Sequence, residues 1–327
     1  MIKKVETVSR TCLPVDEMLC IRRCRYLPGN LTEDAIAGLP RISLVTGVHG
    51  DELEGQFTCY ELGSQLAQHP EGLTGVVDIY PAINPLGIES IRRGVPGFNV
   101  EMNRLFPGNP DGFIVEKVAG EVLESLVGSD LVVDIHASNI FLRELPQARI
   151  NENDAETLTP LASRLNLDFL WIHPSATVLE STLAHSLNAR DTRCIVVEMG
   201  VGMRITRTYG HQLVRGIFNV MRALGIWNIP DAGMDTPHKT LCSLERGVYF
   251  LNAEASGIFV PRVEHCAIME KGEEIGRILD PLTCTVQERI IAPCSGLVFT
   301  LREYPVVYTG SLIARMIEGV EDYQLRI

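Results

Sequence analysis

Between residues 40 and 225, short apolar runs alternate with longer amphipathic segments. The apolar runs are typical of buried strands, and they lie at 41–48, 76–83, 131–136, 167–172 and 194–197. Apolar side chains at helical spacing predict helices at 52–68, 115–127, 154–165 and 209–224. This alternation indicates an α/β layer structure with a largely parallel sheet.

The pattern changes near residue 228. Residues 228–239 contain Pro230, Gly233 and Pro237 without clear periodicity, which is typical of a linker. Short β-like runs that begin at glycine follow it, at 247–250, 257–261, 272–276, 296–299 and 310–313. We therefore predict two domains, 1–230 and 240–327, of which the second is all-β.

The second domain contains two half-repeats, 255–260 and 292–298, and in this it resembles the sandwiched barrel of lipoyl and biotinyl domains. Those carriers need a modifiable lysine on the hairpin between the two halves. The corresponding region here, 279–283, has none, and no lysine follows Lys271. The sequence therefore disfavours a carrier role and leaves structural support, shaping of a substrate entrance, or oligomerisation.

Charge and composition narrow the choice of partners. Acidic residues outnumber basic ones by 41 to 29 in the 327-residue chain, a net charge of −12. This balance disfavours a nucleic acid or a membrane as partner, because both favour a basic surface, but it is compatible with a small substrate. We see no signal peptide and no bilayer-spanning run, so we expect a cytoplasmic protein. Unpaired strand edges in the β-rich domain make a homo-oligomer possible.

The chemistry begins at His49-Gly50-Asp51-Glu52, directly after the apolar run 41–48. An imidazole and a carboxylate three residues apart, where a strand gives way to a helix, can bind one metal ion. His136 ends a second strand-like run and could bring a third ligand. Two histidines and one glutamate, with a fourth position for water, are a ligand set of hydrolytic zinc sites.

Two further carboxylates accompany these runs. Glu198 follows the run 194–197 and should lie at the mouth of the sheet, where it could accept a proton from water and return it to a leaving nitrogen. It could equally be a solvated residue at a strand end. Asp134 lies two residues before His136, on the same side of the strand, and could orient an imidazole of the site or serve as a loop partner.

Arginines are the candidates for binding an anionic substrate. Asn103 and Arg104 stand between apolar residues and a Pro-Gly turn, and a guanidinium there offers bidentate geometry for a carboxylate. Arg92 and Arg93, about ten residues earlier, could polarise a scissile carbonyl or could be surface residues.

Together, the segments 47–52 and 102–108, His136, Glu198 and the β-rich tail resemble the succinylglutamate desuccinylase/aspartoacylase family of the zinc carboxypeptidase clan. The resemblance implies a phosphorylase/hydrolase-like mixed sheet with helices on both faces, followed by the β domain. Family members tend to carry an oxyanion-stabilising arginine closer to the Asn-Arg pair. Here Arg92 and Arg93 are both candidates for that role.

The resemblance also assigns roles. It implies one zinc ion per chain on His49, Glu52 and His136, with Glu198 as base and acid. Further residues would hold the substrate: Asn103 and Arg104 would bind a carboxylate, and a second carboxylate-binding arginine could be Arg143, Arg190, Arg193 or Arg204.

We therefore expect a zinc-dependent amide hydrolase that removes an acyl group from an N-acylated amino acid or a related small amine. A zinc peptidase of the same clan would use identical chemistry on a larger substrate. A catalytically silent metal- or metabolite-binding protein is the third reading, and the presence of Glu198 beside the three ligands argues against it.

Overall fold

The computed structural model describes residues 1–174, 180–230, 240–243 and 247–319. Most of the predicted linker at 228–239 lies outside these described residues. Within them, no helix is both long and apolar enough to cross a membrane.

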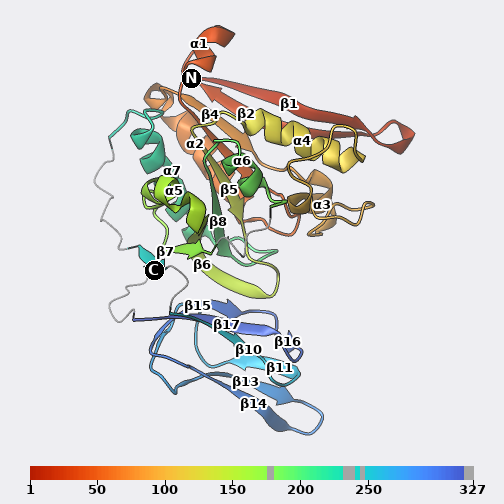
Figure 1. Ribbon diagram of the computed structural model, residues 1–327, viewed down its shortest axis with the longest axis vertical. Helices are drawn as coiled ribbons and strands as arrows, with labels where there is room; N and C mark the ends of the chain where they lie inside the picture. Colours follow the sequence, from red (N-terminus) through yellow and green to blue (C-terminus); the bar gives the residue numbers. More distant parts are fainter. Residues whose placement is uncertain (175–179, 231–239, 244–246, 320–327) are drawn as a thin grey trace.

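A long mixed sheet forms the spine of the molecule (Figure 1). In its first part the strand order is β1-β2-β4-β3-β5-β8-β6, and β7 pairs with β6. The centre, β4-β3-β5-β8, is parallel, whereas β2 and β6 join it antiparallel. The strands are β1 Ile2–Cys12, β2 Met18–Leu27, β3 Arg41–Thr46, β4 Val76–Tyr80, β5 Leu131–His136, β6 Leu142–Asn151, β7 Phe169–His173 and β8 Cys194–Gly200. Alternation alone predicted a largely parallel sheet, and this holds only for the centre; the mixed sheet implied by the resemblance is confirmed.

Helices cover both faces of the sheet, as predicted. On one face α2 and α7 pack together in a core with Leu44 and Val133; on the other, α4 and α6 pack with Val45 and Val132. Because successive strand residues are buried on opposite faces, the central strands are apolar at nearly every position. The α-helices are α1 Glu33–Ala37, α2 Glu54–Gln68, α3 Pro85–Ser90, α4 Ile114–Leu126, α5 Ala155–Ala162, α6 Leu183–Asn188 and α7 Arg207–Ala223, and the short 3-10 helices are Pro14–Asp16, Pro70–Gly72, Met102–Arg104 and Glu152–Asp154.

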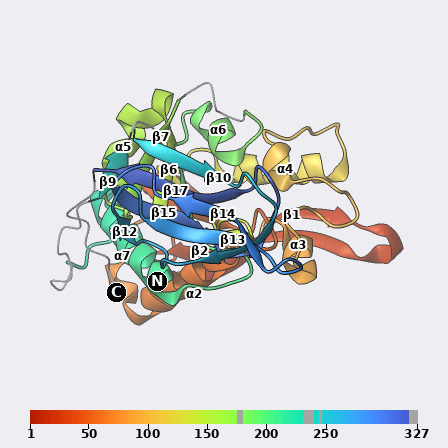
Figure 2. The ribbon, with the colours of Figure 1, turned by 90° about the horizontal axis from the view of Figure 1, so that it is seen from below.

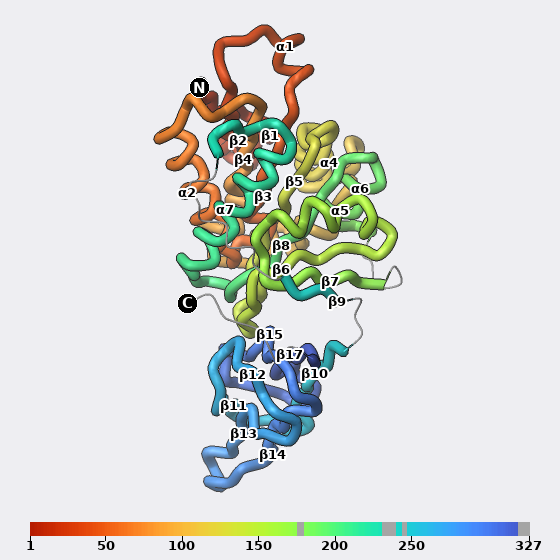
Figure 3. Tube along the Cα trace, turned by 90° about the vertical axis from the view of Figure 1, so that its left-hand side faces the viewer, coloured from red at the N-terminus to blue at the C-terminus, as the bar shows by residue number. Residues whose placement is uncertain are grey.

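The C-terminal part consists of antiparallel strands in two layers, below the α/β part in Figures 1 and 3. One layer is the small sheet β14-β13-β11-β16, and the other contains β10, β15 and β17. Phe259, Ile278, Val298 and Ile313 are buried in the core that these strands share. The strands are β10 Val248–Asn252, β11 Gly257–Pro261, β12 Ile268–Met269, β13 Glu274–Asp280, β14 Thr285–Ile291, β15 Gly296–Arg302, β16 Val306–Val307 and β17 Leu312–Glu318. The short strand β9 Leu241–Ser243 instead pairs parallel with β7 of the α/β part.

The large sheet continues from the α/β part into the C-terminal part. β15 pairs antiparallel with β6, with Thr300 opposite Glu144 and Arg302 opposite Leu142, and β17 and β10 follow (Figure 2). Backbone hydrogen bonds therefore cross between the two predicted domains. The division of the chain into the domains 1–230 and 240–327 stays a prediction.

Two strand regions of the α/β part were not predicted from the sequence. The β1–β2 hairpin extends away from the body of the molecule (Figures 1 and 2). Strand β6 lies at the centre of the large sheet although it contains Glu144, Gln147 and Arg149. Its polar side chains interrupt the apolar run that would mark a buried strand.

Candidate functional site

The predicted metal ligands meet at the carboxyl ends of neighbouring strands. β3 and β5 are parallel, with Thr46 opposite Ile135, so the loop after β3 brings His49 and Glu52 beside His136. This loop packs closely on its neighbours: a Cβ on Gly50 would lie 1.9 Å from the carbonyl carbon of Gly87. Glycine is therefore required at position 50 for the turn that presents both ligands.

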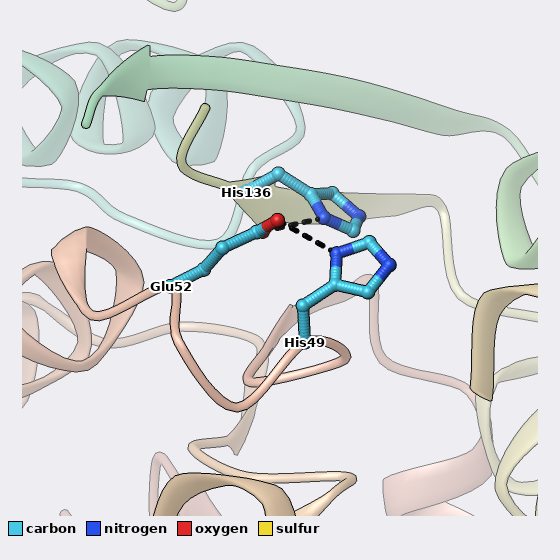
Figure 4. A group of neighbouring side chains, drawn as sticks. All are labelled: His49, Glu52 and His136. Atoms are coloured by element: carbon cyan, nitrogen blue, oxygen red, sulfur yellow. Dashed lines mark hydrogen bonds and ion pairs between the residues drawn. The ribbon is translucent and has the colours of Figure 1, made fainter. Parts of the chain in front are cut away.

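The three side chains converge on one point (Figure 4). His49 Nδ1 lies 2.7 Å from Glu52 Oε1, and His136 Nδ1 lies 2.9 Å from Glu52 Oε2. All three residues are buried, and their ligand atoms lie within 4.8 Å of one another. The predicted cluster of His49, Glu52 and His136 is therefore present as a group that could hold a metal ion.

The chemistry of the donors fits a cation. His49 Nδ1 is buried and has no partner of hydrogen-bond geometry among the described residues, even though it faces the carboxylate of Glu52. Burial lowers the pKa of His49 and so keeps its ring nitrogens available as ligands. Although burial alone would raise it, the pKa of Glu52 is lowered to about 2 by the two imidazoles, so it stays ionised.

Asp134 lies beside the outer nitrogen of His136. Its Oδ2 is 3.2 Å from His136 Nε2, an ion-pair distance without hydrogen-bond geometry. Burial lowers the pKa of His136, but Asp134 and Glu52 outweigh it and raise that pKa well above its usual value. A carboxylate at this position can orient the imidazole, which was one of the two predicted roles.

Glu198 is the last predicted member of the cluster, opposite His136 in the pairing of β5 with β8. Its side chain is only 16% exposed, and its Oε1 lies 3.3 Å from Arg149 Nη1. Burial, opposed by Arg149, raises the pKa of Glu198 to about 7. A carboxyl group with this pKa can exchange protons near neutral pH.

The structure separates the two candidate arginines. Arg93 Nη1 lies 3.0 Å from Glu52 Oε1, its Nε lies 3.2 Å from Glu101 Oε1, and the side chain lines the cavity above the cluster. Arg92 is exposed and borders a different hollow, beside Val95. Geometry therefore brings Arg93 to the cluster and leaves Arg92 outside it.

Asn103 and Arg104 also reach the cavity. Asn103 Oδ1 accepts a hydrogen bond of 2.9 Å from the backbone N–H of Leu183 at the start of α6. Arg104 Nη2 lies 3.9 Å from Glu101, which in turn lies 3.8 Å from His49 Nε2. The pair thus joins the site from the side of His49.

The cavity above the cluster has a volume of about 510 Å³. Five residues that line the cavity were not predicted from the sequence, and we call them the far wall. They are Arg149 of β6, Trp171 and His173 of β7, Phe250 of β10 and Arg315 of β17. These residues share no motif and come from four strands, β6, β7, β10 and β17, so only the fold brings them together.

Among the described residues that line this cavity, none is one of the four arginines proposed to bind a second carboxylate. They contact other groups: Arg143 pairs with Glu303, Arg190 with Glu124, Arg193 with Asp130, and Arg204 with the carbonyl of Met203.

Residues 38–224 match the model of the succinylglutamate desuccinylase/aspartoacylase catalytic domain, and the chain belongs to this family. A stretch of 110 residues is 38% identical to the N-alpha-acetyl-L-2,4-diaminobutyric acid deacetylase of Halomonas elongata. That stretch covers 33% of this chain and 32% of the relative, so the chain matches only about a third of the length of that relative.

Solved structures share the whole fold. The succinylglutamate desuccinylase/aspartoacylase of Rhodobacter sphaeroides superposes with a TM-score of 0.78 at 22% identity, over 97% of this chain and 95% of that one. The product-bound ectoine utilization protein EutE (DoeB) of Ruegeria pomeroyi gives a TM-score of 0.78 at 22% identity, over 96% and 95%. At this identity the likeness concerns the fold, including the C-terminal strands.

Proposed function

We propose that the protein is a zinc-dependent amide hydrolase that removes an acyl group from an N-acylated amino acid or a related small amine. The observation that carries the proposal is the placement of Glu198 in register with His136, beside three convergent buried ligands and in the same cavity. The family membership and the deacetylase named among the relatives support an acyl group on nitrogen as the target.

His49, Glu52 and His136 would hold the ion, and two nitrogens with one carboxylate oxygen suit zinc. When bound, zinc supplies a Lewis acid that activates water and polarises the amide carbonyl. Buried and ionised, Glu52 would offset part of the positive charge of the ion.

Glu198 would take the proton of the attacking water and deliver it to the departing nitrogen. Its raised pKa suits both steps, since the group can hold the proton between them. Arg93, which lines the cavity beside His49, would place positive charge near the developing oxyanion. Asn103 and Arg104 would hold the substrate's carboxylate.

The size of the cavity favours a small substrate over a peptide. Phe250 and Arg315 of the C-terminal strands form part of its wall, and the cavity of about 510 Å³ has room for an acylated amino acid. Parallel assays on N-acyl amino acids and on short peptides separate the deacylase from a peptidase with the same chemistry.

The test of the proposal is elemental analysis of the purified protein together with His49→Ala and Glu52→Ala. We expect about one zinc ion per chain in the wild type and its loss in both variants, with loss of hydrolysis. A matched control is His69→Ala, because His69 is an exposed histidine outside the cavity. Wild-type protein that takes up no zinc even after incubation with the ion would contradict the proposal.

A further inference from the structure

Three neighbouring strands bring the proposed base and several polar side chains onto one face of the large sheet. His136 of β5 lies opposite Glu198 of β8, and Gln147 of β6 lies opposite Glu198 on its other side. Arg149 of β6 lies opposite Val196, one pair further along the same face. Because paired residues of adjacent strands project to the same side of a sheet, Arg149 and Glu198 are diagonal neighbours.

The guanidinium of Arg149 joins two carboxylates. Its Nη1 lies 3.3 Å from Glu198 Oε1, which is an ion-pair distance. Its Nη2 donates hydrogen bonds of 2.8 and 3.0 Å to the two carboxylate oxygens of Glu144. Since a guanidinium is planar and rigid, fixing one nitrogen on Glu144 also fixes the direction of the other toward Glu198.

Glu144 is a firm anchor for this guanidinium. It is buried, and its carboxylate also accepts hydrogen bonds from Gln147 Nε2, from Ser138 Oγ at 3.4 Å and from Arg315 Nη1 at 2.9 Å. A buried carboxylate with several donors around it has one preferred orientation. Glu144 therefore holds Arg149 in one place.

Aromatic rings lie beside both arginines. The guanidinium carbon of Arg149 lies 5.6 Å from the ring centroid of Trp171, and that of Arg315 lies 5.4 Å from the centroids of both Trp171 and Phe250. Such cation–π contacts restrict the guanidinium groups further. Strand β17 of the C-terminal part, which carries Arg315, therefore contributes to the order of Arg149.

Glu198 depends on this arrangement for its orientation. Among the described residues, Arg149 is the one ion-pair partner of its carboxylate, which accepts no hydrogen bond from them. Arg149 and Arg315 carry two positive charges, and Glu144 and Glu198 carry two negative ones, so the two arginines need no additional anion. A base must point at the reacting water within a narrow range of directions, and a misplacement of about 1 Å can lower a rate about a hundredfold.

We propose that Arg149 is a positioning residue, which directs the carboxylate of Glu198 toward the metal cluster, and that Glu144 and Arg315 hold Arg149 in place. This role rests on the proposed function, in which Glu198 is the base. It gives the C-terminal strands a part in catalysis, because Arg315 acts on Glu198 through Glu144 and Arg149 without itself transferring a proton.

The first experiment is steady-state kinetics of the zinc-loaded full chain on N-acetylalanine, N-acetylaspartate and N-succinylalanine. On each substrate that the wild type hydrolyses, Arg149→Ala should lower kcat by about a hundredfold, with KM within about twofold of the wild type and the zinc content unchanged. Arg149→Lys keeps the charge but not the fork, so its loss should be smaller. Arg315→Met should lower kcat several-fold. Arg289→Met is the matched control, because Arg289 is exposed and pairs with Glu274 outside the cavity.

Chemical rescue separates positioning from folding. Guanidinium ion at a low, non-denaturing concentration can occupy the space that Arg149→Ala leaves, and it should restore part of the lost kcat. The same ion should not raise the kcat of Glu198→Gln, which lacks the base, or of Arg289→Met.

The second experiment does not depend on turnover. Crystal structures of the zinc-loaded wild type, Arg149→Lys and Arg149→Ala show where the Glu198 carboxylate lies. We expect it beside the metal cluster in the wild type, and turned away or spread over several conformers in Arg149→Ala. Arg149→Lys keeps the charge, so it tests the placement even if Arg149→Ala folds poorly.

Several results would overturn the role of Arg149. One is a Glu198 carboxylate that keeps its wild-type place and a single conformer in both Arg149 variants. A raised KM with unchanged kcat would mean that Arg149 contacts the substrate instead. A loss of kcat that neither Arg149→Lys nor guanidinium ion reduces would make its role merely structural. If the wild type hydrolyses none of the substrates, the proposed function fails, while the crystal structures still decide whether Arg149 positions Glu198.

Discussion

The two halves of the cavity wall differ in how they are encoded. On one side, the metal cluster comes from strand ends and from one short loop, and its polar residues follow apolar runs. On the other side, Arg149, Trp171 and Arg315 come from the middle of strands in distant parts of the chain. Chemistry carried by strand ends is visible in a sequence, whereas a wall assembled across a sheet is visible only in the fold.

The two halves also meet. Glu198 lies opposite His136 of the metal cluster but contacts Arg149 on the other side of the cavity, and Arg149 shares Glu144 with Arg315. A chain of ion pairs thus links the C-terminal strands to the proposed base. Variants on either side of this link test how far the proposed base depends on the C-terminal strands.

Glu198→Gln should have the largest effect. Because the amide cannot accept the proton, we expect kcat to fall by about 10²–10⁴-fold while zinc content stays unchanged. Glu124→Gln is the control, as Glu124 is an exposed carboxylate paired with Arg190. Near-wild-type turnover of a zinc-loaded Glu198→Gln would refute the role of the base.

Arg93→Ala should lower kcat/KM about a hundredfold more than Arg92→Ala does. Arg93 lines the cavity and contacts Glu52, so its loss removes charge from the region of the oxyanion. Arg92 is exposed, and its replacement should leave kcat/KM within about twofold of the wild type. Steady-state kinetics with zinc content checked in each variant is the measurement, and equal losses would contradict the assignment.

Glu144→Gln should lower the free energy of unfolding by about 3 kcal/mol, because it leaves two partly buried guanidinium groups without their shared carboxylate. The matched control is Glu274→Gln, which also removes a carboxylate shared by several arginines, but at the surface. Its effect should be much smaller. Urea unfolding of both variants measures the difference. Equal destabilisation would mean that the ion pairs of Glu144 contribute no more to stability than those of a surface carboxylate.

The pH dependence should be the most gradual effect. As the base, Glu198 must be ionised, and its pKa is raised to about 7 mainly by burial. Values of kcat/KM should therefore fall as the pH drops below about 7, by at most about tenfold per pH unit, with a bound dication moving the midpoint lower. A profile that stays flat through this acid range would count against Glu198.

Most of the α/β part could be predicted because its central strands are buried on both faces and its helices on one. The predicted metal ligands and Glu198 were found because each follows an apolar run: His49 and Glu52 lie in the loop after β3, His136 is the last residue of β5, and Glu198 lies within β8. Strand β6 could not be predicted, since Glu144 and Gln147 are buried and Arg149 is half-buried by pairing with one another rather than by being apolar. The place of Arg315 in the cavity wall could not be predicted either, because it depends on β17 lying two strands from β6.

The pairing of β15 with β6 has a consequence for dissecting the molecule. A chain cut after residue 230 would lose β15 and leave the backbone groups of Leu142, Arg143 and Glu144 without their partners. An exposed strand edge next to an apolar core is a template for pairing with another chain. The α/β part alone should therefore aggregate rather than persist as a minimal enzyme, so the second predicted domain also serves as the cover of an edge.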